Sequence, residues 1–200
     1  MKRIRKQLAP ESFVHWVRQN RPQNWNSLDG GVKQELADQL RREQGGLCCY
    51  CEQRIAEKNS HIEHLRPRNT YPNDTFDYQN LLSSCLDKKC CGTAKGRWFS
   101  PDMVTPLDDD CEGRFLYLGN GKIIPADAHD SHARDTIDRL NLNCNKLKNM
   151  RMQTFDVYRY MKENVSREEF VEFVSNALQP NHNNEYAGFW TTIKYVAEKA

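Results

Sequence analysis

The centre of the chain carries two cysteine clusters, CCYC at residues 48–51 and CLDKKCC at residues 85–91, on either side of SHIEHLRPR at residues 60–68. A C-x-x-C turn can present two thiolates to one tetrahedral metal ion, for which Zn²⁺ is the usual choice. The 33 residues between the two clusters are enough for a small β-rich unit to return to the same ion. We therefore predict a structural zinc ion held by Cys48, Cys51, Cys85 and either Cys90 or Cys91.

The composition favours a soluble globular protein in a reducing compartment. The 200 residues are 38% hydrophobic and 28% charged, with a formal net charge of +2 and eight cysteines. No apolar run approaches the ~18 residues of a membrane span, and no apolar segment follows the basic N-terminus, so we expect neither a membrane segment nor a secretory signal. In the cytoplasm, where we expect the protein, cysteines serve as metal ligands or buried thiols more often than in disulfides. A redox C-x-x-C is disfavoured, because the sequence lacks the βαβ context of thioredoxin-like sites.

The segment between the clusters carries groups that suit phosphodiester hydrolysis. Glu63 stands directly before His64, and Asn80 follows sixteen residues later. Histidine can act as a general base on water, and a carboxylate can hold a divalent ion that stabilises a phosphate in its transition state. His61 shares the strand face of Glu63, and packing is the favoured role for it. Four basic side chains nearby are candidates for binding phosphate groups: Arg66, Arg68, Lys95 and Arg97.

The order of these motifs resembles the HNH endonuclease family. The family pattern has a C-x-x-C, a D/E-H-x-x-P, an N-L pair and a final cysteine pair followed by a lysine, and the matching stretches are residues 46–52, 61–67, 80–85 and 91–95. The resemblance implies a ββα-metal core in which His64 is the general base and Glu63 is a ligand of a Mg²⁺ or Mn²⁺ ion. It implies that Asn80 holds the metal loop or orients the base.

The chain departs from the family pattern at the second cysteine cluster. Five residues separate Cys85 from Cys91, a wider spacing than usual, and Gly92 stands where the family has Asn or His. Lys95 matches the lysine of the pattern, and this alignment favours Cys91 over Cys90 as the fourth zinc ligand. The third residue of the HNH motif is not assigned, and the candidates to complete the site are His61, Asp87, Cys90 and Lys95.

Further stretches resemble one branch of this family, the HNH nucleases of Septu and retron anti-phage defence systems. These stretches are MKRI at residues 1–4, EQGGLC at residues 43–48 and DTIDRLNLN at residues 135–143. The resemblance implies a PtuA-like ABC/SMC-type ATPase as a partner, with a retron reverse transcriptase and its msDNA as further partners in a retron setting. It implies DNA as the substrate, with RNA, such as tRNA, as the alternative.

Periodic apolar residues on both sides of the centre predict helices. We expect helices over residues 11–19, 27–43, 135–160 in two parts, 166–178 and 185–198, and a β-hairpin of residues 114–118 and 122–124. The predicted fold class is therefore α+β, a zinc-stapled ββα-metal core flanked by N- and C-terminal helices. We divide the chain into an N-terminal helical segment (1–45), the core (46–100) and a hairpin with C-terminal helices (101–200), packed as one globular unit.

The predicted function is that of a metal-dependent HNH endonuclease that hydrolyses nucleic-acid phosphodiesters and acts in anti-phage defence with an ATPase. Two alternatives stay open. One is a non-catalytic zinc module that binds a partner or nucleic acid, for which Gly92 in place of a ligand is the main argument. The other is a nuclease that cuts RNA, such as tRNA, because the catalytic motif does not distinguish RNA from DNA.

Overall fold

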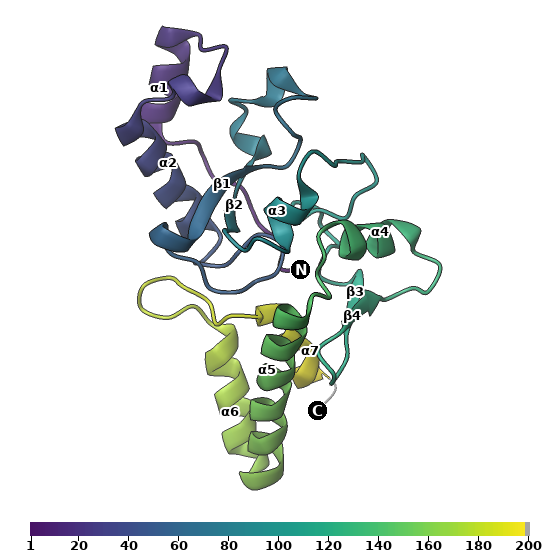
Figure 1. Ribbon diagram of the computed structural model, residues 1–200. Helices are drawn as coiled ribbons and strands as arrows, with labels where there is room; N and C mark the ends of the chain where they lie inside the picture. Colours follow the sequence, from purple (N-terminus) through teal and green to yellow (C-terminus); the bar gives the residue numbers. More distant parts are fainter. Residues whose placement is uncertain (199–200) are drawn as a thin grey trace.

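The computed structural model in Figure 1 describes residues 1–198 and combines helices with two small sheets. Its elements are α1 (Glu11–Asn20), α2 (Gly30–Glu43), β1 (Ser60–His64), β2 (Leu81–Cys85), α3 (Cys91–Lys95), β3 (Phe115–Tyr117), β4 (Ile123–Pro125), α4 (Ser131–Arg139), α5 (Asn145–Asn164), α6 (Arg167–Leu178) and α7 (Trp190–Glu198). This mixture of helices and small sheets confirms the α+β part of the prediction. Within the described residues, no helix is both long and apolar enough to cross a membrane.

The antiparallel pair of β1 and β2 carries the central motif. His64, the last residue of β1, lies opposite Leu81, the first residue of β2, and residues 65–80 connect the two strands. The short helix α3 follows, so the order of elements is strand, strand, helix (Figure 1). Leu81 is buried in one cluster with Leu36 and Leu40 of α2. The N-terminal helices therefore hold the sheet through this hydrophobic contact.

The helix α2 begins at Gly30, whereas the sequence pattern predicted a start at Ser27. The reason is a cap: the Asp29 carboxylate accepts hydrogen bonds of 2.8 and 3.1 Å from two backbone N–H groups of the first turn. Such groups have no partner inside the helix, so a side chain that accepts from them fixes the helix start. The three residues from Trp25 to Ser27 instead form a 3₁₀ turn that buries the indole of Trp25.

Caps also set the bounds of the later helices. The Asp130 carboxylate accepts a hydrogen bond of 2.9 Å from the Ala133 N–H, so α4 begins at Ser131, four residues before the predicted start. The predicted break between α4 and α5 is confirmed. The predicted helix over residues 166–178 is confirmed as α6, which begins after a capping box with reciprocal hydrogen bonds between Ser166 and Glu169.

The helix α7 begins at Trp190 and not at Glu185, because the segment before it is bonded to the central part of the chain. The Phe189 N–H donates to the Glu52 carbonyl at 2.9 Å, and the Thr191 N–H donates to the Glu52 carboxylate at 2.7 Å. These bonds fix the C-terminal helix beside the C-x-x-C turn. A helix pattern alone contains no sign of such a contact.

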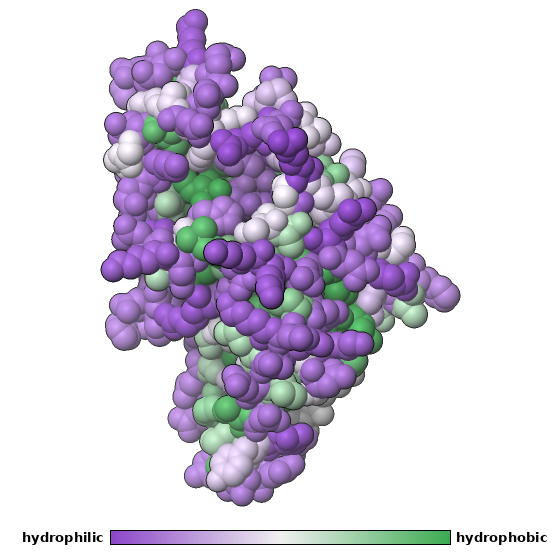
Figure 2. Space-filling model, viewed as in Figure 1, coloured by the Kyte–Doolittle hydropathy of each residue, from purple (hydrophilic) through white to green (hydrophobic). Residues whose placement is uncertain are grey.

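The helices α5 and α6 extend together from the rest of the molecule in Figure 1. With α7 they enclose a small hydrophobic cluster of Tyr158, Phe170, Val174 and Ile193. Figure 2 shows a mainly hydrophilic face with small hydrophobic patches, some of them over this helical pair. The division into three segments stays a prediction, and the last two residues of the third segment, 199–200, lie outside the described residues.

Candidate metal centre and active site

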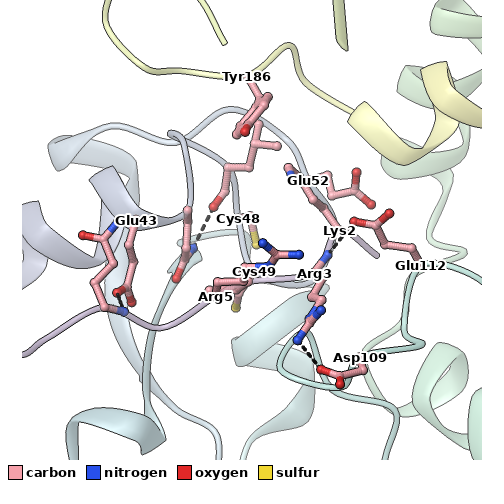
Figure 3. A pocket seen from close by; sticks show the side chains of 14 residues that line it. Lys2, Arg3, Arg5, Glu43, Cys48, Cys49, Glu52, Asp109, Glu112 and Tyr186 are labelled. Carbon is pink, nitrogen blue, oxygen red and sulfur yellow. Dashed lines mark hydrogen bonds and ion pairs between the residues drawn. The ribbon is translucent and has the colours of Figure 1, made fainter. Parts of the chain in front are cut away.

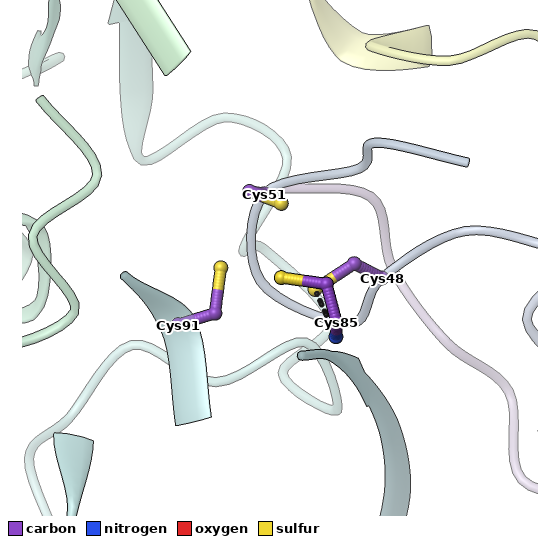
Figure 4. Close-up of side chains that lie close together, drawn as sticks. All are labelled: Cys48, Cys51, Cys85 and Cys91. Carbon is purple, nitrogen blue, oxygen red and sulfur yellow. Dashed lines mark hydrogen bonds between the residues drawn. The ribbon is translucent and has the colours of Figure 1, made fainter. Parts of the chain in front are cut away.

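Four cysteine side chains converge where the C-x-x-C turn, the end of β2 and the start of α3 meet (Figure 4). Their sulfur atoms all lie within 4.8 Å of one another, and all four residues are buried. In a tetrahedral zinc site with Zn–S bonds of ~2.3 Å, the sulfurs stand ~3.8 Å apart, so the cluster has the size to hold one metal ion. Its members are the four cysteines favoured by the sequence: Cys48, Cys51, Cys85 and Cys91.

The backbone decides which of two adjacent cysteines joins this cluster. Cys91 has a left-handed φ of 57°, which is uncommon for a residue other than glycine. Its N–H donates to the carbonyl of Leu140, at the end of α4, at 2.9 Å. Cys90 precedes α3, and its sulfur lies 3.6 Å from that of Cys91 but outside the four-cysteine cluster. The contact with α4 is long-range, so spacing alone could not make this choice.

The pKa is lowered for two thiols of the cluster, Cys48 and Cys85, and raised for the other two, Cys51 and Cys91. Burial raises the pKa of the Cys48 thiol, but hydrogen bonds from the neighbouring thiols outweigh burial and bring this pKa well below its ordinary value. The Cys48 sulfur also accepts a hydrogen bond of 3.4 Å from the backbone N–H of Cys85. Because the thiolate is the form that binds metals, the cluster is suited to hold a metal ion. All eight cysteines are free thiols.

The Glu63 carboxylate lies beside the cysteine cluster and is almost completely buried. The Lys95 ammonium is 2.9 Å from its Oε1, the Tyr50 hydroxyl donates to the same oxygen at 3.2 Å, and the His61 Nε2 is 3.3 Å from Oε2. Burial alone raises the pKa of Glu63, but His61 and Lys95 outweigh it and lower the pKa. Glu63 is therefore an ionised carboxylate inside the protein.

The His64 imidazole is held in one orientation by two contacts. Its Nε2 lies 3.0 Å from the carbonyl oxygen of Thr75, and its ring meets the edge of the Trp25 indole, with centroids 4.5 Å apart and an interplanar angle of 86°. A carbonyl oxygen only accepts, so Nε2 carries the proton and Nδ1 keeps its lone pair in the neutral ring. Burial lowers the pKa of His64 to about 4. The ring is therefore neutral near pH 7 and can accept a proton at Nδ1.

Asn80 fixes the loop that follows His64. Its side-chain oxygen accepts a hydrogen bond of 2.7 Å from the Arg66 N–H. Its amide nitrogen donates to the Arg66 carbonyl at 3.1 Å and to the Asp74 carbonyl at 3.0 Å. Asn80 is 1% exposed and holds the backbone on both sides of the loop. This loop also contains Thr75, so Asn80 is linked to His64 through the backbone and not by direct contact.

A pocket of about 270 Å³ opens between these groups, and its lining includes His61, Glu63, His64, Arg68 and Arg97. Both arginines are exposed, and the Arg68 guanidinium lies 5.8 Å from the centre of the Trp25 ring. A neutral imidazole, a carboxylate and two guanidinium groups therefore line one volume. This arrangement can take a phosphate group together with an attacking water.

Two of the four residues predicted to bind phosphate, Arg66 and Lys95, do not line this pocket. The Arg66 guanidinium pairs with Asp74 at 3.0 Å. Lys95 is 3% exposed, and its ammonium contacts Glu63 and donates to the His64 carbonyl at 3.1 Å. Burial and these contacts make Lys95 a residue that positions Glu63, and it is not among the residues that line the pocket at His64.

Several neighbours of the site were not predicted as part of it. Trp25 packs on His64 although it comes from the connection between two predicted helices, residues 11–19 and 27–43. Thr75 and Tyr50 contribute a backbone carbonyl and a hydroxyl, to which no motif pointed. His61 is the exception: its spacing of two residues from Glu63 on a strand indicates a shared face, and the structure confirms that contact.

A larger pocket of about 440 Å³ lies beside Cys48 and Cys49 (Figure 3). Several of its charged groups pair with each other: the Arg3 guanidinium contacts Asp109, and the Arg3 N–H donates to the Glu112 carboxylate at 3.1 Å. Its walls carry acidic as well as basic side chains. Four acidic residues line this larger pocket, whereas Glu63 is the one acidic residue in the lining of the smaller pocket at His64, and Arg68 and Arg97 have no ion pair within residues 1–198. The smaller pocket is therefore the better candidate for binding a polyanion.

Comparison with known proteins finds relatives but no matching family model. The chain is 32% identical over 124 residues to a candidate HNH endonuclease of retron Vc95 from Vibrio cholerae serotype O1 biovar El Tor, covering 56% of this chain and 60% of the relative. It is 34% identical over 128 residues to the Septu protein PtuB of Bacillus thuringiensis, covering 60% and 45%. A third relative, a candidate HNH endonuclease of retron Ec83 from Escherichia coli, is 23% identical over 243 aligned positions, covering 96% and 92%.

The matches with the first two relatives span about half of their length, 60% and 45%, whereas the third match spans nearly the whole of both proteins. All three relatives carry names from the two kinds of system that the sequence motifs indicated. The resemblance predicted from those motifs is therefore confirmed: the chain is a relative of the HNH endonucleases named in retrons and of the Septu protein PtuB.

Proposed function

We propose that the chain is a metal-dependent endonuclease that hydrolyses phosphodiester bonds of nucleic acids as the nuclease of an anti-phage defence system. The observation that carries this proposal is the pocket in which a neutral imidazole, an ionised carboxylate and exposed guanidinium groups meet. The order strand, strand, helix around this pocket fits the ββα-metal core of the HNH family. The names of the relatives support the same activity.

Each residue has a role that follows from its contacts. His64 takes a proton from the attacking water at Nδ1, because the Thr75 carbonyl holds the proton of its ring at Nε2. Arg68 and Arg97 bind the phosphates that flank the bond to be cut. Asn80 keeps the loop of Thr75 in place, so that the His64 ring stays aimed at the pocket.

Two kinds of metal ion fit these residues. Four buried thiols that lie close enough for one tetrahedral ion are a typical donor set for Zn²⁺, and four thiolates leave no open position, so this zinc is structural. Glu63 is an ionised carboxylate on the wall of the pocket, as a Mg²⁺ or Mn²⁺ ligand must be. When bound there, the divalent ion supplies positive charge for the phosphate and the departing 3′-oxygen.

The proposed partners and substrate are those that the family resemblance implies. The names of the relatives point to Septu and retron systems, and we propose a PtuA-like ABC/SMC-type ATPase as the partner, with a retron reverse transcriptase and its msDNA in a retron setting. DNA is the proposed substrate and RNA the alternative. The free thiols of all eight cysteines fit a cytoplasmic protein.

Glu63→Gln tests the proposal. The neutral amide keeps an oxygen at this position but loses the charge. The cleavage rate of plasmid DNA or tRNA with Mn²⁺ or Mg²⁺ is expected to fall at least ~10-fold, because losing a group that only supports a metal ligand already costs ~10- to 100-fold. The assay runs with and without the ATPase. The control Glu57→Gln removes an exposed carboxylate just before β1 and should cleave like the wild type. Equal cleavage by both variants would refute the role of Glu63.

A further inference from the structure

Gly92 faces the Glu63 carboxylate at the position where the HNH pattern carries a side chain. A Cβ atom at Gly92 would stand 2.5 Å from Glu63 Oε2 and 3.0 Å from His61 Nε2, which is closer than packed atoms approach one another. The His61 imidazole therefore occupies space that a side chain on α3 would need. The glycine at 92 and the histidine at 61 form one arrangement around Glu63.

The two oxygens of the Glu63 carboxylate have different neighbours. Oε1 is held by the Lys95 ammonium at 2.9 Å and the Tyr50 hydroxyl at 3.2 Å, while Oε2 faces His61 Nε2 at 3.3 Å. In an octahedral site with bonds of ~2.1 Å, adjacent ligand atoms stand ~3 Å apart. The Oε2 and Nε2 atoms therefore have nearly the spacing of two adjacent ligands of one ion.

One ring nitrogen of His61 has a position that the contacts within residues 1–198 do not explain. Its Nδ1 is buried and has no hydrogen-bond partner among the described residues, although buried polar atoms almost always have one. The side chain as a whole is 31% exposed and lines the pocket next to His64. A hydrated ion can reach the exposed part of the ring from this pocket.

We propose that His61 is the second protein ligand of the divalent ion at Glu63, in the place that a residue on α3 would otherwise supply. This assignment rests on the proposed function, because it needs Glu63 to hold an ion. Imidazole suits transition metal ions, whereas Mg²⁺ prefers oxygen ligands. A site of one carboxylate and one imidazole therefore favours Mn²⁺, or another first-row transition ion, over Mg²⁺.

The test measures Mn²⁺ binding to the zinc-loaded full chain by calorimetry and by the EPR signal of free Mn²⁺, with no nucleic acid present. His61→Ala is expected to weaken Mn²⁺ binding at least ~10-fold, since losing a group that only hydrogen-bonds a ligand already costs ~10- to 100-fold. The matched control His15→Ala removes an exposed imidazole on α1 and should bind Mn²⁺ like the wild type. Equal affinity in these two variants would overturn the assignment, as would a wild-type chain that binds no Mn²⁺.

A second variant separates a ligand from a hydrogen-bond partner. His61→Gln keeps a side-chain N–H that can donate to Glu63 Oε2 but has no imidazole, and its Mn²⁺ affinity is expected to be as low as that of His61→Ala. An affinity like that of the wild type would overturn the assignment. Zinc content and thermal unfolding show that each variant is folded.

Two different results would distinguish a wrong assignment of His61 from a wrong proposed function. If Glu63→Gln weakens Mn²⁺ binding and His61→Ala does not, His61 is not a ligand while the metal-dependent nuclease stands. If Glu63→Gln cleaves nucleic acid like the wild type, the proposed function fails at Glu63 itself.

Discussion

Replacement of His64 by alanine is expected to lower the rate of nucleic-acid cleavage by ~10²- to 10⁴-fold, the usual contribution of a general base. The expected loss is large because no other described side chain can take over. His61, the other histidine on the pocket wall, lies against the Glu63 carboxylate, and the arginines there stay protonated. The measurement is the initial rate on plasmid DNA and on tRNA with saturating Mn²⁺, in the presence of the ATPase.

The contacts of His64 also predict what the same substitution leaves intact. Its imidazole contacts the Thr75 carbonyl and the Trp25 ring, whereas Glu63 is held by other groups, so His64→Ala should bind Mn²⁺ with unchanged affinity. His129→Ala, which removes an exposed imidazole before α4, is the control for cleavage. A folded His64→Ala that cleaves as fast as this control would rule out His64 as the base.

The central motif was predictable because its chemistry depends on short spacings. Two thiols in a C-x-x-C and an acid beside a histidine are close to each other in any fold that holds them in a turn or strand. The two cysteine clusters could be predicted to share one ion because tetrahedral zinc needs four ligands. The helix starts at Gly30 and Ser131 were missed by three to four residues because Asp29 and Asp130 cap them, although both caps are readable in the sequence.

The rest of the site depends on contacts that no spacing encodes. Trp25 reaches His64 from the N-terminal segment, and Lys95 turns inward to Glu63 although lysines are usually exposed. Gly92 is the clearest case. In the sequence it is a missing ligand and favours a non-catalytic module, whereas in the structure the lack of a side chain there makes room for His61 and Glu63. The same residue therefore supports opposite interpretations, and only the packing around it distinguishes them.

Cys91→Ser is expected to remove the structural zinc and most of the stability of the core, whereas Cys90→Ser should keep both. The two cysteines are adjacent and both are 0% exposed, so each substitution places the same hydroxyl in an equally buried position. Only Cys91 belongs to the four-sulfur cluster. The difference between the two variants therefore isolates metal binding from the cost of burying a serine.

The expected loss of stability in Cys91→Ser follows from the role of structural zinc in folding. Zinc binding contributes ~10 to 16 kcal/mol to the folding of small zinc-finger peptides. Loss of even ~4 kcal/mol would lower the midpoint of thermal unfolding by ~8 to 16 °C in a chain of this length. The measurements are zinc per chain by mass spectrometry, expected to fall from about one to near zero in Cys91→Ser, and thermal unfolding by circular dichroism. Full zinc in Cys91→Ser would mean that Cys90, whose sulfur lies 3.6 Å away, takes its place, and the proposed ligand set would be wrong.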